Sequence, residues 1–317
     1  MEKKHGVKEP KKELTFGRAI YLLAMLVIFS FFLTMMMYYI FAGSDVESLS
    51  GNVALIPIKG IILGDDSSDF LFDDALSSQE TIELIEKADQ NPSIRAIIFE
   101  INSPGGSPVA SEEIANAIKK TNKTSVAWIR EIGTSGAYWV ASSTDYIIAS
   151  RVSITGSIGV IASYTEFSGI MKDYNLTYRR LISGKYKDIG DPFKELAPEE
   201  QEILQSYLDS IRDYFVEEVA KNRNMKKQEV EKAANGLFYL GGEAKKLGLI
   251  DEIGGKDEAI AYIEEKEGIT ADIVEYESEK TLFDLFTDAL GRQSFSLGMG
   301  IGKGLVGTDK NPVRIIA

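Results

Sequence analysis

The sequence predicts an α/β domain, a sheet covered by helices, that follows one N-terminal membrane-spanning helix. Residues 19–43 include no charged side chain, and a helix of this length can cross about 30 Å of hydrocarbon. From residue 44 on, apolar runs typical of buried strands alternate with amphipathic runs of helical period. That alternation is the order expected when helices pack on a sheet, and the segment is long enough to form a large core.

The charges that flank the apolar run predict its orientation. Lysines and one arginine dominate the residues before it, whereas Asp45 and Glu47 open the segment after it. The positive-inside rule therefore predicts a cytoplasmic leader at 1–18, a transmembrane helix at 19–43 and an extracytoplasmic domain beyond. A cleaved signal peptide is the alternative, but its apolar core would be only about 7 to 15 residues long. The length favours an uncleaved anchor in the cell membrane.

Composition limits the function further. The 317-residue chain has a formal net charge of −13, which argues against nucleic acid as a partner. It has no cysteine, which excludes disulfides, thiol catalysis and cysteine-ligated zinc, and no metal or other cofactor is expected. Its single histidine, His5, lies in the leader. If residues 19–43 cross a membrane, no Ser-His-Asp triad can form within one molecule, so serine chemistry needs another base.

The expected elements of the domain follow the hydrophobic periods along the chain. Residues 78–90 predict a helix with Ser77 or Ser78 as its N-cap. The expected strands are residues 52–58, 61–63, 94–101, 125–130, 146–149, 176–182 and 271–276. The other expected helices are residues 109–120, 136–142, 198–222, 225–234 and 257–267. The domain is expected to span residues 44–278, and the glycine-rich stretch within 279–317 predicts a flexible C-terminal tail.

A first motif, Asn-Ser-Pro-Gly-Gly at residues 102–106, directly follows the strand that ends at Ile101. Glycines allow the backbone to turn sharply and leave N–H groups free to point outward. Such amides can hold the oxyanion of an acyl-transfer reaction. An ordinary Pro-Gly turn is the simpler interpretation of these residues on their own.

A second motif, Gly-Thr-Ser-Gly-Ala at residues 133–137, lies between an expected strand and an expected short helix. It is close to the G-x-S-x-G turn that exposes a nucleophilic serine, except that Ala137 replaces the last glycine. Ser135 would gain from the positive end of the helix dipole. A plain N-cap is the alternative role for this serine.

A third segment, residues 183–193, contains Lys185 and Lys187 in a loop before the long helix. A lysine can act as general base when burial and neighbouring groups lower its pKa enough for the neutral amine to accept a proton. Lysines in loops are more often solvated surface charges. The S-x-x-K spacing does not occur after the apolar run, so a serine–lysine dyad would have to be assembled across the fold.

Taken in order, these three segments and Ile-Thr-Gly-Ser-Ile-Gly-Val at 154–160 closely resemble the SppA family of signal peptide peptidases in its short, single-domain form. The resemblance runs from about Val53 to Glu267 and implies the ClpP/crotonase-like fold, a repeated ββα superhelix. It implies a serine endopeptidase with Ser135 as nucleophile and Lys187 as general base. It further implies these supporting roles: Ser157 to orient the lysine, and the backbone N–H groups of Gly105 or Gly106 and of Gly136 to form the oxyanion hole.

The same resemblance implies the partners. Family members degrade remnant signal peptides after release from preproteins, and they form ring-like homo-oligomers in which neighbouring subunits complete each site. Three alternatives stay open from the sequence. One is a protease of the same fold that trims a specific membrane protein, such as a stomatin-like partner. The others are an acyl-CoA enzyme of the crotonase type, which would have to lie in the cytoplasm, and a non-enzymatic oligomeric scaffold at the membrane.

Overall fold

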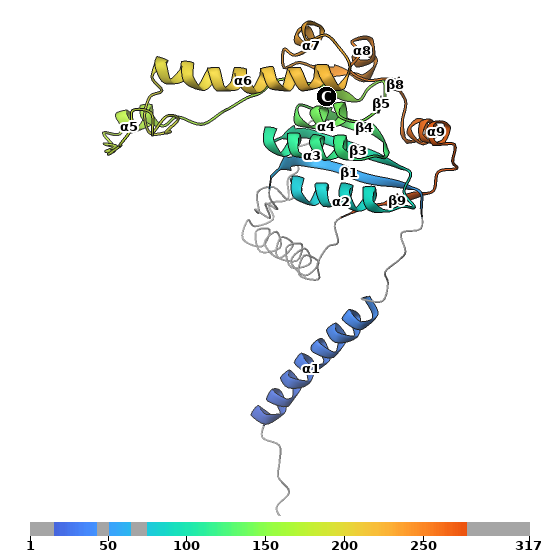
Figure 1. The fold of residues 1–317 in the computed structure, drawn as a ribbon. Coiled ribbons are helices and arrows are strands. Elements are labelled where there is room, and N and C mark those ends of the chain that lie inside the picture. The colour runs from blue at the N-terminus through green and yellow to red at the C-terminus, as the bar shows by residue number, and fades with distance from the viewer. Residues whose placement is uncertain (1–15, 43–50, 65–74, 278–317) are drawn as a thin grey trace, which may run out of the picture. The chain divides into compact units, whose positions relative to one another are not determined.

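The computed structural model describes residues 16–42, 51–64 and 75–277, and it divides into two units, residues 1–50 and 51–317. In the first unit, α1 (Phe16–Ala42) is one continuous helix (Figure 1). Its segment Ile20–Tyr38 is long and apolar enough, by length and composition, to cross a membrane. The expected leader before residue 16 and the expected tail at 279–317 lie outside the described residues.

The second unit is built on a mostly parallel sheet, with nine strands among the described residues. Six strands lie side by side in the order β2-β1-β3-β4-β5-β8, while β9 pairs with β1 and β6 pairs with β4 and β7. Each pairing is parallel except that of β6 with β7. The strands are β1 (Val53–Leu63), β2 (Ala75–Ser77), β3 (Ala96–Gly106), β4 (Thr124–Thr134), β5 (Tyr146–Ala149), β6 (Ile154–Gly156), β7 (Phe238–Leu240), β8 (Glu252–Ile253) and β9 (Ile273–Glu275).

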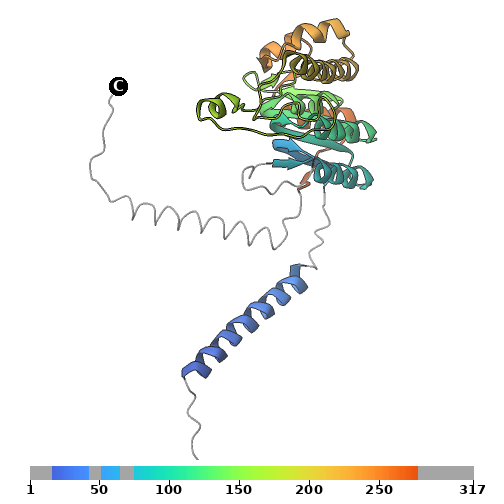
Figure 2. The ribbon, with the colours of Figure 1, turned by 90° about the vertical axis from the view of Figure 1, so that its left-hand side faces the viewer.

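Helices cover the sheet on both faces. α2 (Ser78–Gln90), α3 (Pro108–Lys120) and α4 (Gly136–Ser142) pack together on one face, and Figure 2 shows α2 and α3 on the same side of the strands. α9 (Lys256–Glu267) packs against alternate residues of the central strands, including Val53 of β1. Because both faces are buried, these strands contain continuous apolar runs, at residues 53–58, 96–99 and 126–129, instead of alternating apolar and polar residues. The α/β fold class is therefore confirmed.

Most expected helices are confirmed, and three strands, β1, β3 and β4, are longer than their apolar runs predicted, whereas β5 has the expected bounds and β9 is shorter than the strand expected at 271–276. α2 and α4 have the expected bounds, and Ser77 caps α2 by accepting a hydrogen bond from the Glu80 N–H at 3.3 Å. The strand expected at 94–101 starts at Ala96 and continues as β3 to Gly106. Pairing with neighbouring strands satisfies backbone groups there whatever the polarity of the side chain, so the strand outlasts its apolar run.

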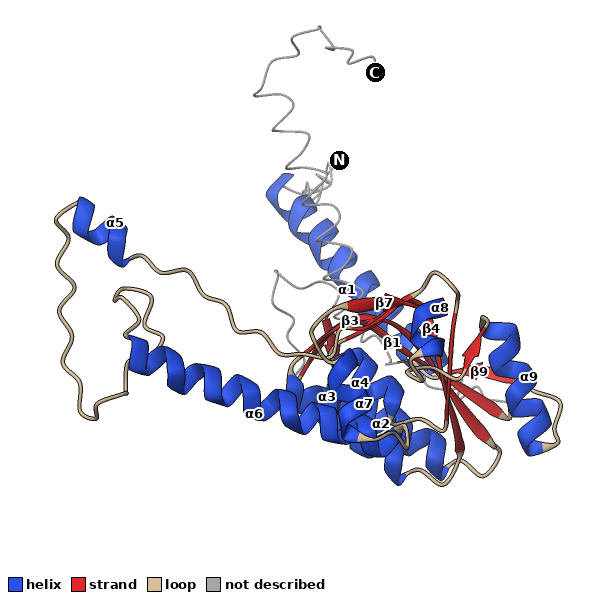
Figure 3. Cartoon of the chain, turned by 90° about the horizontal axis from the view of Figure 1, so that it is seen from above, coloured by secondary structure: helices blue, strands red, loops and turns tan. Residues whose placement is uncertain are grey.

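The prediction of a strand at residues 176–182 is wrong. These residues are irregular and exposed, and Leu181 is fully exposed although it is apolar. They belong to residues 161–197, a segment here named the arm, which includes α5 (Ser168–Asp173). In Figure 3 the arm extends to the outer, N-terminal end of α6 (Pro198–Asn222). The alternation of apolar residues predicted a strand, but no described strand pairs with this stretch.

The long helix α6 is only partly packed. It has the expected bounds, yet the apolar face expected along its whole length is buried only from Phe215 onward, while Tyr207 is exposed. Beyond it, α7 (Lys227–Ala233) and α8 (Gly241–Lys246) lead back to the sheet. The outer half of α6 and the arm therefore present apolar side chains to solvent in a single chain.

Candidate active site

Ser135 lies at a sharp turn between β4 and α4. Its backbone angles are φ 54° and ψ −125°, a conformation that residues other than glycine rarely adopt. The turn is held by the Ser135 N–H, which donates to the Gly156 carbonyl oxygen at 2.8 Å, and by the Trp139 N–H, which donates to the Ser135 carbonyl oxygen at 3.0 Å. This is the geometry of a strained strand-to-helix turn that presents a nucleophile.

Glycines make this turn possible because there is no room for a Cβ. A Cβ on Gly136 would lie 2.2 Å from the Ser111 Oγ, and one on Gly105 would lie 2.7 Å from the Gly136 nitrogen. Gly105 also has a φ of 100°. The Thr134 hydroxyl donates to the Pro104 carbonyl oxygen at 3.1 Å, so the first and second motifs lie directly against each other.

The contacts of the first motif separate its two glycines. The Gly105 N–H donates to the Ser103 Oγ at 3.1 Å, and the Ser103 hydroxyl in turn donates to the Gly60 carbonyl oxygen at 2.6 Å. The Gly105 N–H is therefore engaged inside the protein. The Gly106 nitrogen lies 3.3 Å from the position a Cβ on Gly136 would take. Gly106 and Gly136 are thus the two neighbouring amides that best suit the expected oxyanion hole.

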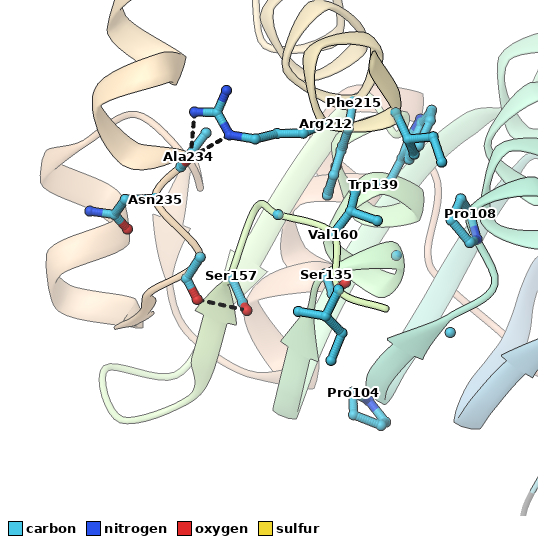
Figure 4. Close-up of a pocket in the computed structure, with 16 residues that line it drawn as sticks. Pro104, Pro108, Ser135, Trp139, Ser157, Val160, Arg212, Phe215, Ala234 and Asn235 are labelled. Carbon is cyan, nitrogen blue, oxygen red and sulfur yellow. Dashed lines mark hydrogen bonds between the residues drawn. The ribbon is translucent and has the colours of Figure 1, made fainter. Parts of the chain in front are cut away.

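A cavity of about 620 Å³ opens beside the turn (Figure 4). Ser135, Gly106 and Gly136 line it together with Ser157, so the cavity gathers residues from three separate segments that carry the sequence motifs. Its wall is largely apolar, and within that wall the rings of Trp139 and Phe215 stack with centroids 4.8 Å apart. The remaining lining residues are Pro104, Pro108, Gly159, Val160, Ile161, Ile211, Arg212, Ala234, Asn235 and Gly236.

Ser157 follows β6 directly and also has a positive φ, 51°. Its hydroxyl donates to the Gly236 carbonyl oxygen at 3.1 Å, and its N–H donates to the Leu237 carbonyl oxygen at 2.9 Å. The structure thus brings Ser157 and Ser135 to one cavity.

Lys187 is placed differently. It is an exposed residue of the arm, in a turn where its N–H donates to the Gly184 carbonyl oxygen at 3.2 Å. No lysine is among the described residues that line the Ser135 cavity. In a single chain, therefore, the structure does not bring the expected general base to the expected nucleophile.

Lys185, the other lysine of this loop, has a partner. Its ammonium group donates to both carboxylate oxygens of Glu199 at 2.8 Å. The hydrogen bond with Glu199 is the main cause, and the one with Tyr186 the second, that holds the pKa of Lys185 above its usual range. Because a lysine with a raised pKa stays protonated at neutral pH, Lys185 is poorly suited to accept a proton from a serine.

Comparisons with known proteins identify the family. Residues 117–270 match Peptidase family S49. A protein named as a protease in Methanocaldococcus jannaschii is 36% identical over 239 residues, which cover 74% of this chain and 76% of that protein. This chain belongs to peptidase family S49. The expected resemblance is confirmed, and the chain is a serine protease.

Other relatives of this S49 protease carry related names. A signal peptide peptidase SppA of Enterococcus faecium is 30% identical over 235 residues, covering 73% of this chain and 68% of that protein. Protease 4 of Haemophilus influenzae is 32% identical over 222 residues, covering 69% of this chain but 35% of that protein. A solved structure of a membrane-bound stomatin-specific protease mutant is 14% identical, covers 72% of this chain and 98% of that chain, and has a TM-score of 0.47.

The Ser135 cavity also includes a cation that the sequence did not indicate. Arg212 of α6 lines the cavity and donates to the Ala234 carbonyl oxygen from Nε at 3.1 Å and from Nη2 at 2.7 Å (Figure 4). A guanidinium stays charged in proteins and cannot replace the missing lysine as base. Arg212 lies 77 positions after Ser135 in the sequence on a strongly charged helix, so no local pattern could assign it to this cavity.

Proposed function

We propose that this chain is a membrane-anchored serine endopeptidase in which Ser135 of one copy and Lys187 of a neighbouring copy form the catalytic dyad. One observation carries the proposal: Ser135 is held at φ 54° on a strand-to-helix turn that faces an apolar cavity. Strain of this kind persists where the surrounding structure fixes it, and it is concentrated at active sites.

The dyad would work by acyl transfer. The neutral amine of Lys187 removes the proton of the Ser135 hydroxyl as its oxygen attacks a peptide carbonyl. The N–H groups of Gly106 and Gly136 stabilise the oxyanion of the tetrahedral intermediate. The lysine then gives the proton to the leaving amine, and water hydrolyses the acyl-enzyme. Ser157, in the same cavity, orients the amine of the neighbouring copy's Lys187.

Two features of the single chain support completion of the site by a second copy. The cavity contains no lysine among its described lining residues, and Lys187 lies on the exposed arm. The arm also exposes apolar side chains that a soluble monomer would normally bury, with Ile161 89% and Tyr174 76% exposed. A neighbouring copy that covers these side chains could deliver Lys187 to the cavity at the same time.

The substrate class follows from the cavity wall and the N-terminal helix. Apolar lining residues, Trp139, Val160 and Phe215 among them, suit the hydrophobic core of a signal peptide better than a polar peptide. α1 would anchor the enzyme in the cell membrane, where such peptides remain after release, with the leader in the cytoplasm and the catalytic domain outside. We therefore propose remnant signal peptides and other membrane-derived peptides as substrates.

The proposal is tested by active-site labelling. The full chain, solubilised in mild detergent, is treated with a fluorophosphonate and analysed by peptide mass spectrometry, with Ser135→Ala and Lys187→Ala as matched variants. We expect an adduct on Ser135 that is absent from both variants. Labelling of another serine, or unchanged labelling in Lys187→Ala, would contradict the dyad.

A further inference from the structure

The arm carries a cluster of charges next to Lys187, in which every member except Arg180, 41% exposed, is largely buried. Asp188, the residue after Lys187, forms ion pairs with Arg180 and with Lys194, the latter at 3.4 Å. Lys194 also pairs with Glu200 of α6 at 2.5 Å, and the other oxygen of Glu200 accepts a hydrogen bond from the Ala197 N–H at 3.2 Å. We name Arg180, Asp188, Lys194 and Glu200 the arm cluster.

Burial distinguishes the arm cluster from the other ion pair of the same loop. The side chains of Asp188 and Glu200 are 9% exposed and that of Lys194 is 15% exposed. In the pair of Lys185 with Glu199, the side chains are 66% and 58% exposed. An exposed pair contributes little, whereas a buried charge that loses its partner is strongly destabilising. The geometry of the loop therefore depends on the arm cluster far more than on Lys185.

The arm cluster holds the loop at Asp188, the residue next to Lys187, which is the proposed general base. Lys187 and Asp188 belong to a run of tight turns, closed by the Lys187 N–H to Gly184 oxygen bond and by the Ile189 N–H to Tyr186 oxygen bond, both 3.2 Å. Asp188 ties this run to α6 through Lys194 and Glu200. A shift of Asp188 would therefore carry Lys187 with it.

We propose that Lys194 is a positioning residue: through Asp188 it fixes the loop that presents Lys187 to the neighbouring copy. This inference rests on the proposed function, in which Lys187 is the general base. Without the Lys194 charge, Asp188 and Glu200 would keep two buried negative charges against the single positive charge of Arg180. The loop would then rearrange to solvate or pair them, and Lys187 would leave its productive position.

The first experiment compares full-chain variants in detergent with a fluorogenic apolar peptide. We expect Lys194→Met to lower kcat by about a hundredfold, the loss that a 1 Å misplacement of a catalytic group can cause, with a nearly unchanged KM. Lys194→Arg, which keeps the charge, should restore most of kcat. Lys185→Met is the matched control on the same loop and should behave like the unmodified chain.

A second experiment separates positioning from general folding. Chains with Ser135→Ala can supply only Lys187, and chains with Lys187→Ala can supply only Ser135, so mixed oligomers of the two are expected to recover activity. Lys194→Met added to the Ser135→Ala chain should abolish that recovery, whereas Lys194→Met added to the Lys187→Ala chain should leave it intact. Equal loss in both placements would show a structural role and overturn the inference.

The outcomes also distinguish this inference from the proposed function. If Lys187→Ala alone is inactive and Lys194→Met is fully active, the positioning role is wrong and the dyad stands. If Lys187→Ala is active, the dyad itself is wrong, and the inference that depends on it is overturned as well.

Discussion

Ser135 and Gly156 are joined by a backbone hydrogen bond of 2.8 Å, in which the Ser135 N–H donates to the Gly156 carbonyl oxygen. This bond extends the parallel pairing of β4 with β6, where Thr134 lies opposite Gly156. The next residue of each strand is a serine with positive φ, 54° at Ser135 and 51° at Ser157. The pairing of β4 with β6 therefore holds the backbone at Ser135, and the bond from the Ser157 N–H to the Leu237 carbonyl oxygen holds the second serine that lines the cavity.

We expect Ser135→Ala and Ser135→Gly both to reduce peptidase activity to background, because each removes the nucleophilic oxygen. The two variants should differ in stability. Glycine tolerates φ 54° and ψ −125° whereas alanine does not, so Ser135→Gly should be more stable than Ser135→Ala by about 1 kcal/mol, after the extra unfolded-state entropy of glycine is subtracted. Activity assays and denaturant unfolding check this; equal stabilities would argue against a strained turn.

The two lysines of the loop should respond differently to removal. Lys187→Ala should abolish activity because the serine proton then has no acceptor. Lys185→Ala should retain nearly full activity, since Lys185 is paired with Glu199 in an exposed ion pair. Steady-state kinetics of the two variants measure this, and an inactive Lys185→Ala beside an active Lys187→Ala would move the base to Lys185.

Mixing variants should reveal whether copies share a site. Equal amounts of Ser135→Ala and Lys187→Ala chains, dissociated and reassembled together, should recover roughly a quarter of full activity if each site combines residues of adjacent copies at random. A dyad within one chain predicts no recovery. Each variant reassembled alone is the control, and the measurement is peptide hydrolysis after the oligomeric mass has been verified.

Ser157→Ala should lower kcat by about tenfold while leaving the fold intact, because Ser157 lines the cavity and the only role of its hydroxyl in the proposal is to orient the lysine. Ser143→Ala is the matched control: its hydroxyl donates to the Val140 carbonyl oxygen within the α4 end, and it does not line the cavity. A Ser157→Ala chain with unmodified kcat would remove Ser157 from the site.

Stability should depend on pH through Glu218 of α6. Burial raises the pKa of this carboxyl, but hydrogen bonds from Lys119 at 2.6 Å and Lys221 at 2.9 Å outweigh it and hold the pKa below its usual range. The stabilisation is therefore present above the unfolded pKa of about 4.3 and is lost as pH falls through the lower folded pKa.

Glu218→Gln should accordingly cost about 1 to 3 kcal/mol at pH 7, as expected for hydrogen bonds to a charged group, and less near pH 3. Denaturant unfolding of both chains at the two pH values gives the difference. A cost that does not change with pH would show that the ion pairs of Glu218 contribute nothing.

The sequence by itself determined the elements whose cause is local. Apolar residues at the 3.6-residue period predicted the helices α2, α4 and α6, and nearly continuous apolar runs predicted the central parallel strands. Burial against a neighbouring layer produces both patterns. The glycine-rich turns that flank Ser135 and the uncharged run of α1 were equally readable, since each depends on residue types at adjacent positions.

Only the tertiary structure decided which distant residues meet. The Ser103 hydroxyl, which accepts from the Gly105 N–H, is itself held by the distant Gly60 carbonyl oxygen of β1, and this engagement of Gly105 favours Gly106 for the oxyanion hole. Arg212 enters the cavity from a helix far along the chain. In the tertiary structure, residues 176–182 form part of the exposed arm and not a strand. Lys187 also lies on the arm, and it does not line the Ser135 cavity. A periodic pattern reports that a face could be buried, but the partner that buries it is set by long-range packing.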